Sequence, residues 1–293
     1  MKHSAKAFAP GNISCIFQIH EDVDPAKMGS MGLGFTINKG VTVTVETQHL
    51  ASVQLQKTEI FFNGEKIEFS TVEDVVKKVT KPIPSGGWDK GLGSHNVKVS
   101  LSSPLPLGGG FGLSGASALA TAYAINDLFA LKKTKLDLAK IAHIAEVENK
   151  TGLGDVTNQY FGGCLVKTVP SSEFKVQRIP LENTPVYCKF FSKLSTKSVL
   201  SDKESKEKIN RAATEALEKV QSLLQEKKKI AFSDIISLSK EFAENSGLLT
   251  DQQVTQTIQE IESRSGHASM IMLGNGVFSD IPFDGADEFF ITS

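Results

Sequence analysis

The sequence has few of the residues that mark a disulfide-stabilised or zinc-binding protein. Its 293 residues include three cysteines, Cys15, Cys164 and Cys188, and none of them forms a C-x-x-C pair. An odd number of widely spaced cysteines predicts neither a disulfide framework nor a zinc site, and it fits a reducing compartment. Nowhere do the roughly 18 consecutive apolar residues of a membrane-spanning helix occur.

An excess of charge of one sign is also missing. The 32 lysines and arginines against 33 aspartates and glutamates give a net charge of −1. This balance favours neither nucleic acid nor an anionic membrane as a partner, so an anionic ligand must be held by a local site. The first residues lead into no long apolar stretch, and we therefore expect a soluble, cytoplasmic protein without a targeting signal.

The most informative stretch is a glycine-rich segment at residues 104–117. Alternating apolar and polar residues predict a strand over 96–101, and an alanine-rich apolar run predicts a helix over 116–131. Glycines between a strand and a helix start allow backbone N–H groups to converge on an anion. The segment therefore predicts a phosphate-binding loop, with a merely structural tight turn as the alternative.

Two common nucleotide motifs do not account for this loop. Residues 110–115 match G-x-G-x-x-G, but two prolines separate them from the strand, and the segment 136–149 is helical in pattern where a second parallel strand should lie. The G-x-x-x-x-G-K-[ST] motif is absent. The sequence therefore indicates a phosphate site of another kind.

Strands dominate the chain before this loop. The run 7–14 predicts a strand that enters a turn at Pro10-Gly11, and 29–34 predicts a second glycine-rich loop that carries Ser30 and precedes a strand at 41–45.

Further strands are expected between residues 50 and 70, including Ile60–Phe62. A capping box at Ser70–Glu73 predicts a helix to about Lys78, and prolines and glycines predict a loop over 81–93.

An acidic segment follows the glycine-rich loop. A helix is expected from Thr134, and it places His143 and Glu146 on one face because they are three residues apart. It ends in a glycine loop in which Gly-Leu-Gly precedes Asp155, a geometry that can turn this carboxylate into a cleft.

The rest of the chain predicts a second α+β unit. Phe161–Lys167 indicates a buried strand, and a change of composition between Pro170 and Pro185 predicts a domain boundary. The expected elements beyond it are a strand at 186–191, a helix from a capping box at Ser201–Glu204 to about Lys229, helices at 233–245 and 251–263, the latter capped by Thr250, a strand at 268–273, a turn at 274–276 and a strand near Phe289.

Three glycine-bearing segments, taken in order, resemble the motifs of the GHMP kinase superfamily. Pro10-Gly11 resembles the first motif, Pro106–Ser117 the phosphate-binding second motif, and Ser269–Val277 a weakened third. Within the superfamily, residues 142–156 are most similar to the archaeal pantoate kinases.

This resemblance implies a two-domain α+β fold. Residues 1–180 would form an ATP-binding domain like ribosomal protein S5, and residues 181–293 a ferredoxin-like domain. The implied reaction transfers the γ-phosphoryl group of ATP to the 4-hydroxyl of pantoate, giving 4-phosphopantoate for coenzyme A synthesis. ATP would lie between the domains with Mg²⁺, and the protein would be a homodimer.

The resemblance also implies roles for individual residues. Asp155 would act as general base or orienting acceptor. Ser114 and Glu146 would hold Mg²⁺, with Glu148 as the alternative to Glu146. Ser30, His143 and Lys167 would bind pantoate. The nucleotide would contact Pro106, Gly108, Gly109, Gly110, Gly112, Leu113, Ser114, Gly115 and Ala116.

Two positions depart from the family pattern. Lys167 stands where relatives usually carry arginine, which offers a bidentate fork instead of a point charge, and Asn12 stands where they tend to have histidine. The alternative functions are another small-molecule kinase of the superfamily, such as a mevalonate- or homoserine-kinase-like enzyme, a diphosphomevalonate-decarboxylase-like enzyme, or a non-catalytic nucleotide-binding regulator.

Overall fold

The computed structural model describes residues 3–49, 58–80, 95–192, 202–226 and 229–293. Within these residues the large sheet has strands in the order β4-β3-β5-β2-β6-β7, and β1 pairs antiparallel with β2. Its strands are β1 (Ser4–His20), β2 (Gly29–His49), β3 (Thr58–Phe62), β4 (Glu65–Lys66), β5 (His95–Ser102), β6 (Cys164–Lys167) and β7 (Gln177–Ile179).

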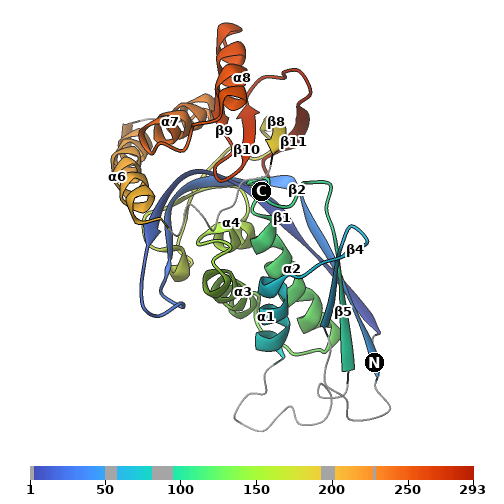
Figure 1. The fold of residues 1–293 in the computed structure, drawn as a ribbon. Helices are drawn as coiled ribbons and strands as arrows, with labels where there is room; N and C mark the ends of the chain where they lie inside the picture. Colours follow the sequence, from blue (N-terminus) through green and yellow to red (C-terminus); the bar gives the residue numbers. More distant parts are fainter. Residues whose placement is uncertain (1–2, 50–57, 81–94, 193–201, 227–228) are drawn as a thin grey trace.

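Helices cover one face of this sheet (Figure 1). They are α1 (Ser70–Val79), α2 (Leu113–Leu128), α3 (Lys135–Asn149) and α4 (Asp155–Phe161). The α2 helix is buried on most sides because it lies between the sheet and the other three helices, which explains why its sequence is apolar without a polar stripe. The start of α2 is therefore held rigidly.

A smaller sheet with the order β11-β8-β10-β9 follows. Its strands are β8 (Pro185–Ser192), β9 (Ala268–Met270), β10 (Asn275–Ser279) and β11 (Asp287–Phe290). The helices of this half of the chain are α6 (Lys203–Glu226), α7 (Phe232–Asn245) and α8 (Gln252–Ser263). The predicted α+β class is confirmed. Because α6 and α7 also pack on β1, the division into domains 1–180 and 181–293 stays a prediction.

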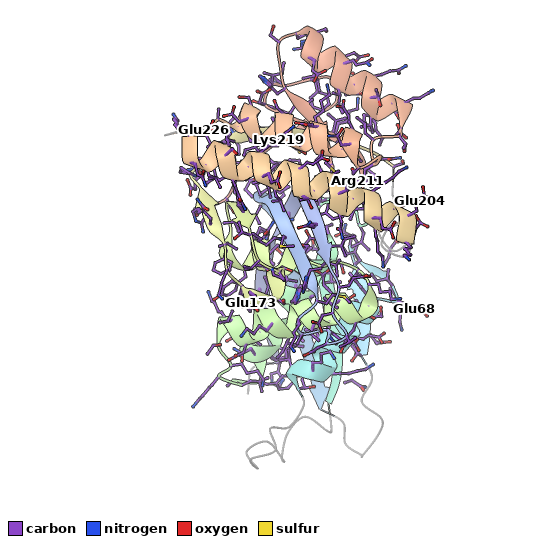
Figure 2. All side chains as sticks on the ribbon, turned by 90° about the vertical axis from the view of Figure 1, so that its left-hand side faces the viewer. Glu68, Glu173, Glu204, Arg211, Lys219 and Glu226 are labelled. Atoms are coloured by element: carbon purple, nitrogen blue, oxygen red, sulfur yellow. The ribbon has the colours of Figure 1, made fainter. Side chains whose placement is uncertain are left out.

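The α6 helix lies across the end of the β1–β2 pair (Figure 2). Asn210 fastens it there: its Oδ1 accepts from the Ile19 N–H at 2.7 Å, and its Nδ2 donates to the Ile19 carbonyl at 3.1 Å. Phe35 of β2 makes edge contacts with Phe232 and Phe278, at ring-centroid distances of 5.4 and 5.5 Å. These contacts join the large sheet to the second half of the chain.

Two predicted loops are in fact strand. Pro10-Gly11 does not end β1 but coincides with a shift of its register against β2, where proline's missing N–H is tolerated. The stretch Gly29–Gly34 belongs to β2, because pairing with both β1 and β6 holds it extended despite its glycines. The predictions of a turn and a loop were wrong at these two places.

Two helix caps also differ from the predictions. The α1 helix begins at Ser70 itself and has no side-chain cap, and α8 is capped by Asp251 instead of Thr250. The predicted loop at 81–93 lies outside the described residues, and so does Ser201 of the predicted capping box at Ser201–Glu204. In the part of the chain that the structure describes, no helix combines the length and apolarity needed to cross a membrane.

Candidate active site

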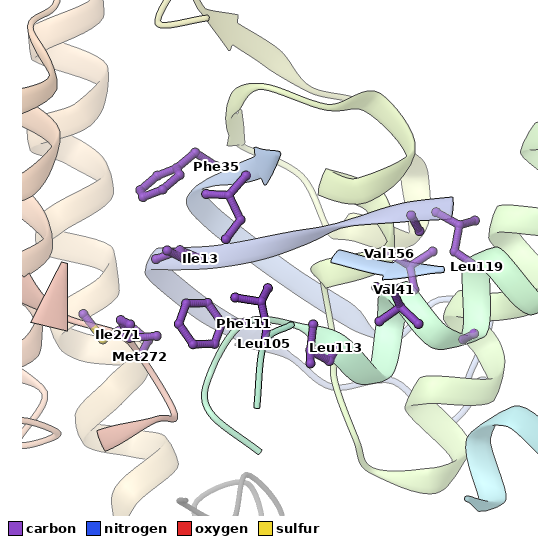
Figure 3. Close-up of a cluster of buried hydrophobic side chains, with 14 of the residues drawn as sticks. Ile13, Phe35, Val41, Leu105, Phe111, Leu113, Leu119, Val156, Ile271 and Met272 are labelled. Carbon is purple, nitrogen blue, oxygen red and sulfur yellow. The ribbon is translucent and has the colours of Figure 1, made fainter. Parts of the chain in front are cut away.

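The three glycine-bearing segments meet in space. The Asn12 N–H donates to the Phe111 carbonyl at 2.9 Å, which joins the first segment to the second. A Cβ atom added to Gly110 would lie 2.7 Å from Ile271 Cγ2, so the second segment also touches the third. Figure 3 shows Ile271 and Met272 approaching Phe111 from the side of the small sheet. Segments about 260 residues apart in sequence therefore form one site.

The second segment places free backbone donors at the start of α2. Gly112 precedes the helix with a φ of 60° and provides no side-chain cap. The first helical bond runs from the Ala116 N–H to the Gly112 carbonyl at 3.1 Å. The N–H groups of Leu113, Ser114 and Gly115 thus lack backbone acceptors within the described residues. A helix start of this kind can bind an anion, so the predicted phosphate-binding loop stays a prediction that the geometry allows.

A cavity of about 330 Å³ opens in front of this helix start. Among the predicted nucleotide-binding residues, it is lined by Gly108, Gly110, Gly112, Leu113 and Ser114. Pro106, Gly109, Gly115 and Ala116 do not line it. The turn from Lys150 to Asp155 also lines it, and further lining residues include Ser30, Met272 and Leu273.

Glu146 is fully buried beside the start of α2. A Cβ at Gly115 would lie 2.9 Å from its Oε2, and one at Gly152 would lie 2.8 Å from either oxygen, so these glycines leave room for the carboxylate. Its Oε1 accepts a long hydrogen bond from Thr151 Oγ1 at 3.4 Å. Within the described residues, Glu146 Oε2 and Ser114 Oγ are buried without a hydrogen-bond partner.

These orphaned oxygens fit a hard divalent cation. Mg²⁺ is commonly held by one or two carboxylates together with substrate phosphates, so it does not need a cluster of protein ligands. No group of three or more His, Cys, Asp or Glu side chains suited to a metal occurs in the described ranges. Ser114 and Glu146 could supply the protein's share of such a site.

Glu148, the alternative acid on α3, points elsewhere. It forms an ion pair with Lys78 at 2.6 Å, and its side chain is 36% exposed. Neither acid lines the cavity itself, but Glu146 lies directly behind Gly152, which does. The structure therefore favours Glu146 over Glu148 as the functional carboxylate.

Asp155 is the first residue of α4 and lines the cavity. Its Oδ1 accepts from Asn12 Nδ2 at 2.6 Å, and Asn12 Oδ1 accepts in turn from Asn158 Nδ2 at 2.9 Å. Asn12 is therefore the residue that aims the carboxylate. Sequence reasoning did not identify Asn158, although its spacing of three residues from Asp155 places both on one helix face.

Of the three residues predicted to bind the acceptor, Ser30 lines the cavity, whereas Lys167 and His143 are buried and do not line it. Lys167 Nζ donates to the Gly154 carbonyl at 3.0 Å. A Cβ at Gly154 would lie 2.8 Å from Lys167 Nζ and would also collide with the Ser30 hydroxyl, so this glycine lies between them.

His143 is buried farther back and does not line the cavity. Its Nε2 donates to the Met28 carbonyl at 2.9 Å, two residues before Ser30.

Burial determines the protonation of this cluster. It raises the pKa of Glu146 to about 8, and the charge of Asp155 adds to the rise. Burial also raises the pKa of Asp155, against the opposing effects of Lys167, Asn12 and Ser14. It lowers the pKa of Lys167 to about 8, while Asp155 acts in the other direction. Burial thus disfavours the charged forms of these side chains, and a cation bound beside the two carboxylates would favour their ionised forms.

The raised pKa values of the two carboxyl groups predict how stability depends on pH without metal. Because the pKa of Glu146 rises from 4.5 to about 8 on folding, the folded protein holds a proton that the unfolded chain has released between these values. The free energy of unfolding should therefore fall as pH rises from about 5 to 8. Asp155 contributes with the same sign.

Urea unfolding in EDTA at pH 5.5, 7 and 8.5 measures this trend. The Glu146→Gln variant should be less sensitive to pH than the unmodified protein. Equal pH dependence of the two proteins would contradict the assignment.

Comparison with known proteins agrees with this geometry. Residues 70–163 match the model of the GHMP kinases N terminal domain. A pantoate kinase of Methanocaldococcus jannaschii is 31% identical over 272 residues, which cover 92% of this chain and 90% of that one. A pantoate kinase of Thermococcus kodakarensis is 32% identical over 97% of this chain and 89% of that one.

A solved structure described as a phosphotransferase related to the CoA biosynthesis pathway has the same architecture. It superimposes with a TM-score of 0.80 at 28% identity and covers 99% of this chain and 96% of its own. Similarity of sequence and of fold thus extends over nearly the whole length. The chain belongs to the GHMP kinases.

Proposed function

We propose that this protein is a pantoate kinase, which transfers the γ-phosphoryl group of ATP to the 4-hydroxyl of pantoate. The observation that carries the proposal is the similarity to pantoate kinases over more than nine-tenths of the chain. The site supports it, because a helix N-terminus free to bind phosphate and a buried, aimed carboxylate face the same cavity. A cytoplasmic homodimer is part of the proposal and rests on resemblance.

The nucleotide would extend from this cavity along residues 104–107. A second cavity, of about 660 Å³, lies there and shares Leu107 with the first. Its walls come from both halves of the chain, including Asn63 and Ile67 on one side and Phe190 on the other. This cavity has both polar and apolar walls and adjoins the proposed phosphate site, so it could hold a nucleoside. ATP would then lie between the two halves, as the resemblance implies.

Ser114 and Glu146 are the proposed ligands of Mg²⁺. When bound, Mg²⁺ would neutralise charge on the phosphate oxygens. The N–H groups of Leu113, Ser114 and Gly115 stabilise negative charge at the same place. Gly112 permits this arrangement, since its φ of 60° and a Cβ position only 3.1 Å from Asp155 Cγ disfavour any larger residue.

Asp155 is the proposed proton acceptor for the attacking hydroxyl. As the hydroxyl oxygen bonds to phosphorus and the bond to the ADP oxygen breaks, the hydroxyl proton passes to Asp155. The carboxylate must be ionised beforehand, and Lys167 and Asn12 favour that form. Ser30 would contact the acceptor directly, while Lys167 and His143 would shape that end of the cavity from behind.

The proposal predicts which acceptor supports turnover. ADP release from ATP and Mg²⁺ is measured with pantoate, mevalonate, homoserine or no acceptor. Pantoate alone should raise the rate, by at least a hundredfold over the rate without acceptor, because general-base catalysis and positioning require a correctly placed hydroxyl. Stimulation by mevalonate or homoserine in place of pantoate would assign a different acceptor to this GHMP kinase.

A further inference from the structure

Lys150 is the one cationic side chain among the residues that line the cavity in the described part of the chain. Besides Lys150, the ionisable groups at the cavity are carboxyl groups, since Asp155 lines it and Glu146 adjoins it. The proposed nucleotide adds further negative charge through its phosphates. Lys167 is 4% exposed and bound to the Gly154 carbonyl, so it does not offer a free cation to the cavity.

The backbone of Lys150 is unusual for a lysine. It has a φ of 56° and a ψ of 37° at the end of α3. The Thr151 N–H donates to the Glu146 carbonyl at 3.0 Å and the Lys150 N–H to the Val147 carbonyl at 3.1 Å, which together form a Schellman motif. Glycine or asparagine normally occupies this left-handed position, so a lysine here is held at an energetic cost. Such conformations concentrate at functional sites.

The polar neighbours of Lys150 are already engaged elsewhere. Glu148 pairs with Lys78 at 2.6 Å, and Asn149 Nδ2 donates to Asp74 Oδ2 at 2.7 Å. Lys150 itself is exposed and forms no ion pair with any residue that the structure describes. Its ammonium group is therefore available to a ligand.

The position of Lys150 favours the nucleotide phosphates, rather than the acceptor, as its ligand. The turn from Lys150 to Asp155 has two ends. At one end, Thr151 and Gly152 contact Glu146, the proposed metal ligand. At the other end, Gly154 lies against Ser30 and Lys167, the proposed acceptor residues. Lys150 adjoins the Glu146 end.

Given the proposed function, we propose that Lys150 binds phosphate oxygens of the nucleotide and is a further determinant of nucleotide affinity. A lysine ammonium makes charge-assisted hydrogen bonds to phosphate and needs no fixed fork geometry to do so. Its flexible stem can follow the phosphates as they enter the cavity.

The test compares Lys150→Asn and Lys150→Arg with a matched control. Asparagine readily adopts the left-handed conformation, so Lys150→Asn removes the charge without straining the turn. Lys132 is another exposed lysine with a left-handed φ, of 58°, but lies away from the cavity, so Lys132→Asn serves as the control. Calorimetry gives the Kd of ADP without acceptor, and steady-state kinetics give the KM values of ATP and pantoate.

We expect Lys150→Asn to weaken ADP binding and raise the KM of ATP by about tenfold, the effect of one charge-assisted hydrogen bond. In Lys150→Asn, the KM of pantoate should not rise and the Tm should not fall. Lys150→Arg should restore most of the ADP affinity, and Lys132→Asn should bind ADP as the unmodified protein does. Unchanged ADP affinity in Lys150→Asn, or a rise confined to the KM of pantoate, would overturn the assignment. If the unmodified protein binds ADP but phosphorylates no pantoate, the proposed function fails while this comparison still decides the role of Lys150.

Discussion

Replacing Asp155 with asparagine is expected to lower the turnover number with pantoate by about three orders of magnitude, the range typical of a lost general base. The neighbouring network should survive the change. The carbonyl oxygen of asparagine can still accept from Asn12 Nδ2, which lies 2.6 Å from Asp155 Oδ1 in the native site. What is lost is the capacity to take the hydroxyl proton.

Stability distinguishes this loss from misfolding. Burial raises the pKa of Asp155, so removing its charge should leave the Tm unchanged or higher. The matched control is Asp137→Asn, at the exposed start of α3. There the Thr134 hydroxyl lowers the pKa of the aspartate and the pair forms a capping box, so this variant should lose stability but keep its turnover. Unchanged turnover in Asp155→Asn would show that another group accepts the proton.

Replacing Glu146 with glutamine is expected to lower kcat/KM by two to three orders of magnitude, roughly the effect of removing one strong electrostatic contact to the transferring group. The Mg²⁺ concentration that gives half-maximal activity should rise at the same time. Both effects follow from the buried Oε2, which has no hydrogen-bond partner in the described residues and therefore fits a cation. The amide of glutamine is a much weaker ligand than a carboxylate.

The control for this variant lies two residues along the same helix. Glu148→Gln breaks only the partly exposed pair with Lys78, so its kcat/KM should stay within about twofold of the unmodified protein. Titration of each variant with Mg²⁺ at fixed ATP gives the comparison. A larger loss of kcat/KM in Glu148→Gln than in Glu146→Gln would show that Glu148, and not Glu146, is the metal ligand.

Much of this molecule could be predicted from its sequence, because the informative signals are local. The apolar run after the glycines predicts α2, and the helical spacing of apolar residues after Thr134 predicts α3. Asp155 could be identified because the glycines that precede it allow the chain to turn sharply.

The errors arose where distant pairing overrides local preference. The glycines at 29–34 favour a loop, yet hydrogen bonds to β1 and to β6, about 130 residues later in the sequence, make them strand. The same holds for the site: nothing near Asn12 in sequence shows that it will meet Asp155, since 143 residues separate them. Lys150 was overlooked because a lysine at a helix end is ordinarily a solvated residue, and only the cavity reveals its position.

The most direct test of the central claim is the identity of the product. The protein is incubated with ATP, Mg²⁺ and pantoate, and the new phosphate ester is examined by proton-coupled ³¹P NMR. Transfer to the 4-hydroxyl gives an ester on a CH₂ group, whose phosphorus signal is a triplet. Transfer to the 2-hydroxyl gives an ester on a CH group, whose signal is a doublet. We expect the triplet. A doublet, or no ester at all while ATP is bound, would contradict the proposed transfer to the 4-hydroxyl.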